Sequence, residues 1–168
     1  TTGNKTYYAK WNAIGYTISY NLNGGSVATA NPTTYNITSA AITLNNPTKT
    51  GYTFTGWTGS NGNTAQTSVT IASGSTGDKS YTAKWTANKY YVKYNANNGT
   101  GTMSNSEHTY DTAKNLTANS FTRTGYTFNG WNTNADGTGT AYANGASVKN
   151  LSSTNGATVN QYAQWKIV

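Results

Sequence analysis

The residues of this chain that could do acid–base or metal chemistry are few, and one short stretch holds most of them. The sequence of 168 residues has four carboxylates, one histidine and no cysteine. These titratable residues are Asp78, Glu107, His108, Asp111 and Asp136. Only Glu107, His108 and Asp111 are near one another in sequence. Because catalysis needs titratable groups held together in space, this stretch is the candidate to test for an active site.

A serine-based triad in this stretch would need Ser104 or Ser106 as its nucleophile. The arrangement is unfavourable, because neighbouring residues of a strand point to opposite faces and because the stretch has the composition of a loop. A metal site at Glu107, His108 and Asp111 would offer too few oxygens for calcium and too few nitrogen or sulfur ligands for zinc. We therefore predict no catalytic residue, no metal site and no cofactor, in a protein that is not an enzyme.

Side-chain cross-links are a third kind of chemistry to consider. An amide bond between Lys and Asn side chains needs a carboxylic acid buried beside the pair. Asp111 with Lys114 and Asn115 has these residue types, but the three are too close in sequence to brace two strands. Asp78 beside Lys79 has the same weakness. A cross-link stays an open alternative, which intact mass would reveal as the loss of one ammonia.

The aromatic residues allow two interpretations. The chain has 14 Tyr and 5 Trp but little Leu, Ile, Val or Phe. Exposed rings could stack on sugars, whereas rings that alternate along strands belong to a core, and an aromatic side chain buries more area than an aliphatic one. The alternation predicts a core of Tyr and Trp. The rings that we expect at the surface, as speculative binding residues, are Tyr8, Tyr91 and Tyr142.

The charge balance is basic, with a formal net charge of +7 although only 9% of residues are charged. The lysines are spread along the chain without any run of three. Solvated surface lysines explain this pattern, and weak attraction to an anionic polymer, such as cell-wall material or an acidic glycan, is the functional alternative. Without a basic stripe or a known motif, we predict no specific nucleic-acid partner.

The elements that carry these residues repeat along the chain. The signature Gly51–Trp57 (GYTFTGW) returns as Gly125–Trp131 (GYTFNGW), 74 residues later. The same offset relates Tyr16 to Tyr90. A fixed period of this length indicates tandem units. We predict a terminal strand and linker of a preceding repeat, a first unit and a second unit, over residues 1–15, 16–89 and 90–168.

Each unit should open with a strand that ends at an Asn-containing turn and close with a strand of the type Tyr-x-Ala-x-Trp. Thr and Asn, which favour strands and turns, make up about a third of the chain. Residues 6–11 match the closing strand without a unit ahead of them, so the chain looks like a fragment of a longer array. Whether residues 6–11 pair with the first unit stays open.

Within the signature we expect Tyr52 and Phe54 to face one way and Trp57 the other. The glycine before the tryptophan should allow another backbone or ring to approach closely. The segment between the opening strand and the signature fits a strand with a short irregular or helical piece, and the residues do not decide between the two.

The linkers between units are short. Four residues follow Trp11 and four follow Trp85 before the next opening Tyr, and four residues span at most about 14 Å. Equal, short linkers favour a semi-rigid rod over a loose string. No run of 18 apolar residues is present, so we predict no membrane span.

The strand with its Asn-Gly turn, the central G-Y-x-F-x-G-W and the closing Y-x-A-x-W together resemble the Listeria–Bacteroides repeat family, of the internalin B-repeat type. The resemblance covers Tyr16–Trp85 and Tyr90–Trp165. It implies a mostly β (α+β) fold of tandem β-grasp-like units, each with one short helix, in an elongated array. It also implies an extracellular location on the bacterial cell surface, mainly of Gram-positive bacteria. Gln161 departs from the pattern, since the other copies have Tyr there, and acidic residues are sparse.

Two functions follow as expectations. The first is a non-catalytic stalk or adhesion module that projects a distal domain, with the adjacent repeats of the same chain as its partners. The second is a module that binds a glycan or a host protein through surface tyrosines or exposed strand edges. Exposure separates the two, because buried aromatics favour the spacer and a contiguous aromatic patch beside lysines favours binding.

Overall fold

The computed structural model describes residues 2–168 and divides them into two compact units. Unit 1 comprises the described residues up to Pro47 together with Phe54–Lys84. Unit 2 comprises Thr48–Thr53 and Trp85–Val168. The segment Thr48–Thr53 therefore clusters with unit 2, although it belongs to the first repeat in sequence.

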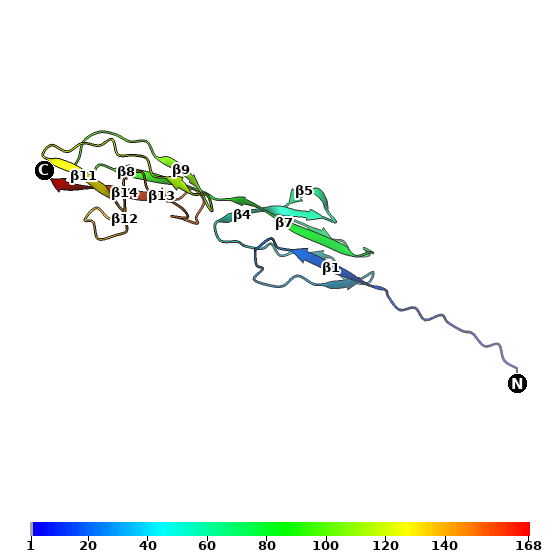
Figure 1. The fold of residues 1–168 in the computed structure, drawn as a ribbon. Coiled ribbons are helices and arrows are strands. Elements are labelled where there is room, and N and C mark those ends of the chain that lie inside the picture. The colour runs from blue at the N-terminus through cyan, green and yellow to red at the C-terminus, as the bar shows by residue number, and fades with distance from the viewer. Residues whose placement is uncertain (1) are drawn as a thin grey trace. The chain divides into compact units, whose positions relative to one another are not determined.

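Strands account for all the regular secondary structure of residues 2–168 (Figure 1). The strands of the first repeat are β1 (Gly15–Asn21), β2 (Thr34–Asn36), β3 (Ile42–Thr43), β4 (Tyr52–Gly59), β5 (Gly62–Gln66), β6 (Thr70–Ile71) and β7 (Lys79–Ala87). Those of the second repeat are β8 (Lys89–Asn95), β9 (Ser106–Thr109), β10 (Lys114–Asn115), β11 (Tyr126–Asn132), β12 (Ala141–Tyr142), β13 (Ser147–Val148) and β14 (Thr158–Ile167).

The mostly β prediction is confirmed, but the α+β class and the β-grasp unit with a short helix are wrong for residues 2–168. The undecided middle segments form short strands joined by turns. Their Thr and Asn residues explain this, because β-branched and turn-forming side chains are weak helix formers. The described residues hold no helix long and apolar enough to cross a membrane.

Both repeats build the same five-stranded sheet. The strand order is β2-β1-β7-β4-β5 in the first repeat and β9-β8-β14-β11-β12 in the second. In each repeat the opening strand pairs in parallel with the closing strand, with Tyr20 opposite Tyr81 and Tyr94 opposite Gln161. Parallel neighbours need a long crossover. Residues from both ends of a repeat are therefore needed to complete its sheet.

The predicted turns after the opening strands are confirmed. Both central residues of each turn have positive φ, which Asn and Gly tolerate. The first Asn of each turn also reaches the closing strand. Asn23 Nδ2 donates to the Ala83 carbonyl at 2.9 Å, and Asn97 Nδ2 donates to the Ala163 carbonyl at 2.8 Å. Each turn thus fastens the end of the opening strand to the strand beside it.

The core is aromatic, as predicted. Trp57 and Trp131 are fully buried, and from residue 16 onward every Tyr and Trp is buried or partly buried. The buried hydrophobic cluster of unit 2 consists of Tyr90, Val92, Tyr94, Leu116, Phe121, Trp131, Val148 and Ala163. Because one large ring replaces several small side chains, a unit of this size can close a core with few aliphatic residues.

The prediction that Phe54 and Trp57 face opposite ways is wrong. Their ring centroids lie 5.5 Å apart in an edge-on contact, and those of Phe128 and Trp131 lie 5.0 Å apart. A register shift between Phe128 and Gly130 marks a β-bulge where β11 pairs with β14. The extra residue reverses the alternation, so the phenylalanine and the tryptophan pack on one face.

Gln161 introduces unpaired polar atoms into the second core. Tyr81, its counterpart, stacks on Tyr20 with ring centroids 6.1 Å apart. Gln161 is fully buried, and neither its oxygen nor its nitrogen has a hydrogen-bond partner among residues 2–168. Such groups keep the desolvation cost of burial without recovering it through a bond. The second unit therefore carries a local penalty that the first avoids.

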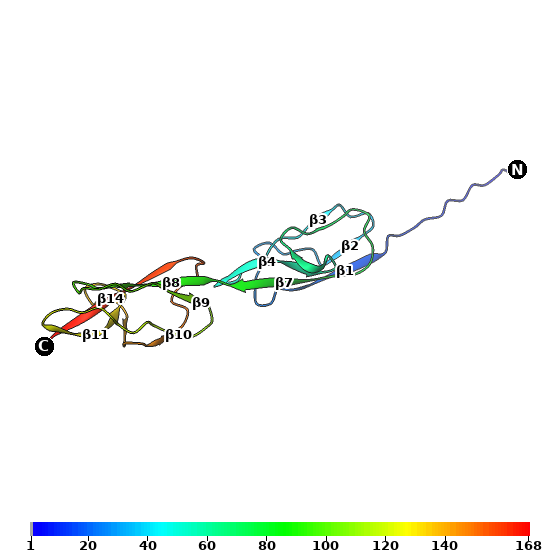
Figure 2. The same cartoon turned by 90° about the horizontal axis from the view of Figure 1, so that it is seen from above.

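Residues 6–11 do not form the predicted half-buried strand. They are exposed and outside any strand, with Tyr7, Tyr8 and Trp11 between 86% and 90% exposed. Both views show the chain ahead of β1 running away from the sheet without a strand beside it (Figures 1 and 2). The reason lies in the sheet order, since β1 already has β2 on one side and β7 on the other.

Substitution of the signature glycine tests the close approach of another backbone at Gly56. Gly56 has φ +135°, and an added Cβ would lie 2.5 Å from the Gln66 nitrogen. Gly62 has φ +106° with open space around it. We expect Gly56→Ala to lower the free energy of unfolding by about 3 kcal/mol or more and Gly62→Ala by about 1–2 kcal/mol, from strain alone. Urea unfolding measures both, and equal losses would contradict the close approach at Gly56.

Candidate functional site

His108 lies in the core of unit 2. It is 1% exposed and stacks on Tyr90, with ring centroids 5.3 Å apart. Its Nε2 atom lies 2.9 Å from Ser106 Oγ, but its Nδ1 atom has no partner among the described residues. A catalytic triad needs a carboxylate at that nitrogen to orient the ring. The geometry therefore provides a buried histidine beside a partly buried serine, without the third group.

The carboxylates of this stretch turn away from the histidine. Glu107 binds Lys89 Nζ at 2.7 Å and accepts a bond from the Tyr91 hydroxyl at 3.2 Å. The bond from Lys89 is the main cause of the lowered pKa of Glu107. Ser104 is exposed. No group of three or more His, Asp or Glu residues placed to hold a metal ion occurs in residues 2–168.

The residues considered for a cross-link have other partners. Lys114 Nζ donates to the Glu107 carbonyl at 2.7 Å, and Asp111 is bonded to Asn150. Asp78 accepts the Thr17 backbone N–H at 2.8 Å. Neither candidate, the trio of Asp111, Lys114 and Asn115 or the pair of Asp78 and Lys79, has the buried acid that a cross-link needs, since both aspartates are exposed.

The three tyrosines predicted at the surface occupy different places. Tyr8 lies in unit 1 and is 90% exposed. Tyr91 on β8 and Tyr142 on β12 lie in unit 2 and are partly buried. Tyr142 packs against the core cluster. Because β14 and β11 lie between β8 and β12, Tyr91 and Tyr142 do not form one patch.

The loop after Trp131, which differs in length between the copies, forms a shallow polar hollow in unit 2. Thr133, Asn134, Asp136 and Tyr162 line it. The Asp136 carboxylate accepts the N–H and the hydroxyl of Thr138 at 3.0 and 2.7 Å. These bonds lower the pKa of Asp136, so its charge serves the loop itself.

Asn88 is a buried polar residue of unit 2 whose hydrogen-bonding groups all have partners, and sequence reasoning missed it. It is 8% exposed and is the one residue between β7 and β8. Its N–H donates to the Gly51 carbonyl at 2.9 Å and its Oδ1 accepts from Thr53 Oγ1 at 2.6 Å. Its Nδ2 donates to the Ser153 carbonyl and its carbonyl accepts the Tyr110 N–H, both at 2.8 Å. All four of its hydrogen-bonding groups are satisfied inside unit 2.

Gly51 and Tyr52 hold the segment Thr48–Thr53 against the remainder of unit 2. A Cβ at Gly51 would overlap the Tyr110 ring, so only glycine fits there. Its φ of +77° adds a second reason for glycine. Tyr52 packs edge-on against Tyr110, with ring centroids 5.8 Å apart. The glycine turn at the start of the signature thus provides a close-packed contact within unit 2.

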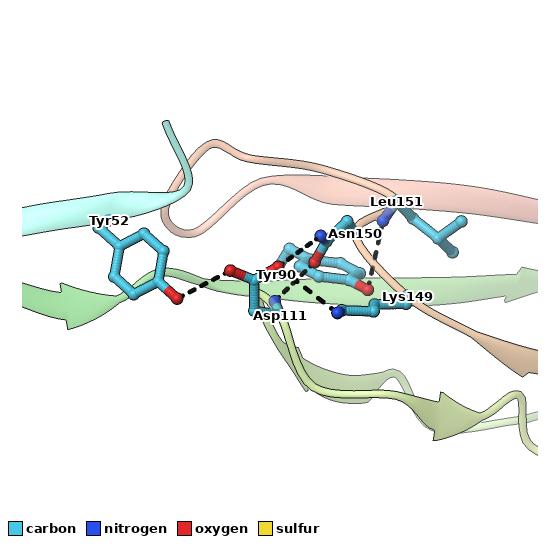
Figure 3. A network of polar contacts seen from close by, with 6 residues as sticks. All are labelled: Tyr52, Tyr90, Asp111, Lys149, Asn150 and Leu151. Carbon is cyan, nitrogen blue, oxygen red and sulfur yellow. Dashed lines mark hydrogen bonds and ion pairs between the residues drawn. The ribbon is translucent and has the colours of Figure 1, made fainter. Parts of the chain in front are cut away.

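Asp111 completes this contact with a network of polar bonds (Figure 3). The Tyr52 hydroxyl donates to Asp111 Oδ2 at 2.8 Å. Asn150 binds both the N–H and the carboxylate of Asp111, at 2.6 and 2.8 Å, and Lys149 lies 3.7 Å away. The bond from Asn150, and after it the bond from Tyr52, lower the pKa of Asp111. The bond between Tyr52 and Asp111 in turn raises the pKa of the Tyr52 hydroxyl.

What this arrangement can do is fix a backbone segment rather than transform a substrate. Its donors and acceptors bind one another. The residues considered above for a catalytic triad or a metal site are not brought together in it. The repetition of the Gly-Tyr pair was a signal for part of it. Asp111, Asn150 and Asn88 carried no such signal, because none of them recurs at the equivalent position of the other repeat.

The buried histidine predicts a pH-dependent stability. Burial, and then the charge of Lys114, lower the pKa of His108 below its ordinary value of 6.5. The unfolded chain therefore takes up a proton near that value while the folded chain does not, so stability should fall as the pH drops below it. Thermal unfolding between pH 7 and 5 should show this slope, and His108→Gln should flatten it. An equal slope in both proteins would contradict the assignment.

The tyrosine–aspartate bond predicts a shifted titration. In Asp111→Asn the Tyr52 ring should titrate at a lower pH, because the carboxylate that holds its proton is gone. The amides of Thr48–Thr53 should also exchange faster. Tyrosine-resolved NMR titration and hydrogen exchange measure both effects. Asp136→Asn, which lies outside the network, serves as the control, and a Tyr52 titration unchanged in Asp111→Asn would refute the bond.

Comparison with known proteins gives one match and one absence. The sequence profile of the Listeria–Bacteroides repeat domain matches residues 16–87 and residues 90–163. No curated protein sequence matches this chain. The two matched ranges cover most of the chain, and each includes the signature strand of one five-stranded sheet and most of that sheet's other strands. The chain therefore belongs to the Listeria–Bacteroides repeat family, with two copies of the repeat in tandem.

Proposed function

We propose that this chain is a tandem-repeat stalk or adhesion module of an extracellular protein on the bacterial cell surface. In this role it carries a distal domain away from the cell and does no chemistry of its own. Family membership supports the tandem-repeat architecture. The mechanism is geometric, because each repeat adds one folded unit of fixed size to the chain.

The observation that carries the proposal is the junction at Asn88. The linker expected over residues 86–89 is almost entirely strand, since β7 ends at Ala87 and β8 begins at Lys89. The remaining residue, Asn88, makes four hydrogen bonds within unit 2. A linker with so little free backbone resists bending, whereas a Gly- or Ser-rich linker behaves as a random coil.

The burial of the aromatics supports a spacer over a carbohydrate-binding surface. No Tyr or Trp from residue 16 onward is exposed. The exposed aromatics are Tyr7, Tyr8 and Trp11 in the segment ahead of β1. Their exposure favours, as a second candidate, binding of a glycan or host protein through this segment or through the unpaired edges of the sheets.

Small-angle X-ray scattering of the whole chain, with a glycan-array screen of the same sample, tests the proposal. We expect an extended particle whose scattering does not change with salt, and no glycan hits. Asn88→Gly should broaden the distribution of interatomic distances, since it removes two side-chain bonds from the junction. Asn98→Gly, at an exposed turn residue with φ +67° that glycine tolerates, should leave the distribution unchanged.

A flexible particle with reproducible glycan hits would contradict the proposal that the chain is a stalk. Loss of those hits in Tyr8→Ala, Tyr91→Ala or Tyr142→Ala would then establish the binding alternative.

A further inference from the structure

An apolar groove opens on the surface of unit 1 beside the start of β1. It has a volume of about 380 Å³, and its lining includes Trp11, Ile14, Tyr16, Ile37 and Thr38. Trp11, Ile14 and Ile37 are 88%, 70% and 51% exposed. Large apolar side chains gathered at such exposures mark a contact surface.

The register of the sheets identifies the equivalent place in unit 2. Gly15 pairs with Asn36 in the first repeat, and Lys89 pairs with Thr109 in the second. Asn36 therefore matches Thr109, and the next residues along the chain, Ile37 and Tyr110, match each other.

By the same count, Thr38 matches Asp111 and Ile14 matches Asn88. The groove of unit 1 thus occupies the position at which unit 2 binds the segment Thr48–Thr53. In unit 2 that position is covered, with Gly51 against the Tyr110 ring and the Tyr52 hydroxyl on Asp111.

We propose that the groove of unit 1 is the docking site for the Gly-Tyr turn of a further repeat, joined to the chain ahead of Thr6. This inference rests on the proposed function as a tandem array and names the partner of one of its units. The occupant is a segment of the form Lys/Arg-Thr-Gly-Tyr, as found at Lys49–Tyr52 and Arg123–Tyr126.

The chemistry of the groove suits such a turn. Ile37 would pack on the glycine as Tyr110 does in unit 2, and an aliphatic side chain lies well against a tyrosine ring. The Thr38 hydroxyl donates to Asn36 Oδ1 at 2.7 Å, which leaves its oxygen lone pairs for the phenol of the incoming tyrosine. The N–H of Ile14 would bond to the glycine carbonyl, as the N–H of Asn88 does to that of Gly51.

The turn is formed before it docks. In Lys49–Tyr52, which is covered, the lysine Nζ lies 4.0 Å from the tyrosine ring centroid and the glycine φ is +77°. In Arg123–Tyr126 the guanidinium lies 3.8 Å from the ring centroid and the glycine φ is +79°. The space beside Gly125 is empty of other described residues. A preformed turn loses little conformational entropy on docking.

A repeat in the same chain fits the groove better than a second copy of this chain. In Arg123–Tyr126 the Gly125 carbonyl already accepts the Val168 N–H at 3.1 Å. Val168 is the counterpart of both Asn88 and Ile14. In a turn from another molecule, the glycine carbonyl would therefore already be bonded to Val168 of its own chain and could not accept the Ile14 N–H. In a repeat that closes on Thr6–Trp11, that carbonyl would accept the Ile14 N–H instead.

An extended chain tests the proposal. Residues 90–159 are joined directly ahead of Thr6, so that Thr6–Trp11 serve as the closing strand of the added repeat. We expect the Ile14 amide to exchange at about one tenth of its rate in the original chain, or more slowly still. We also expect the ring current of the docked tyrosine to shift the Ile14 and Ile37 methyl resonances. Ile37→Asp should abolish both changes, while Ile167→Asp, at an exposed isoleucine outside the groove, should preserve them.

The donor side has its own matched pair. Tyr126→Ala in the added repeat should release the protection of Ile14, and Tyr126→Ala in the terminal repeat should not. If the core amides of the added repeat are protected while Ile14 exchanges as before, the docking proposal is overturned. It is also overturned if the Ile37 methyl of the original chain shifts with protein concentration or with added glycan. The scattering experiment on the original chain does not involve the groove, so a rod with an unprotected Ile14 overturns the docking alone.

Discussion

The parallel pairing of each opening strand with its closing strand is the constraint on which each unit depends. It places the two ends of a repeat side by side in the middle of the sheet, with Tyr20 opposite Tyr81 and Tyr94 opposite Gln161. The signature strand completes the sheet on the free side of the closing strand, and the Asn of the first turn donates to the same strand. Loss of this pairing would leave the buried tryptophan of the signature without one wall of its core.

The sequence predicted what depends on local chemistry and on repetition. The Asn turns, the aromatic core and the two tandem copies are all visible in residue types and spacing. The prediction that the phenylalanine and the tryptophan of the signature lie on opposite faces was wrong. Alternation assumes an uninterrupted strand, and the bulge beside Gly130 adds a residue. The expected helix came with the family resemblance, whereas the spacing of the middle segments had left a short irregular or helical piece open.

The contact that holds Thr48–Thr53 could be predicted only in part. The Gly-Tyr pair recurs and suggests a turn, yet its partners differ between copies. Asp111 and Asn150 are 39 residues apart and become neighbours only through the fold. Asn88 stands where the first repeat has Ile14, so averaging over the copies hides it. The position that contacts the Gly-Tyr turn is polar in one repeat and apolar in the other, and the sequence of one repeat alone does not reveal this difference.

The parallel geometry has a mechanical consequence for each unit. When a unit is pulled by its two ends, tension enters the opening strand at its start and the closing strand at its finish. Since the two strands are neighbours and point the same way, the pull slides one along the other. The ladder bonds between them then bear the load in shear, together, rather than opening one after another as in a hairpin that is unzipped. Each repeat therefore places its resistance to extension in the ladder that also defines its fold.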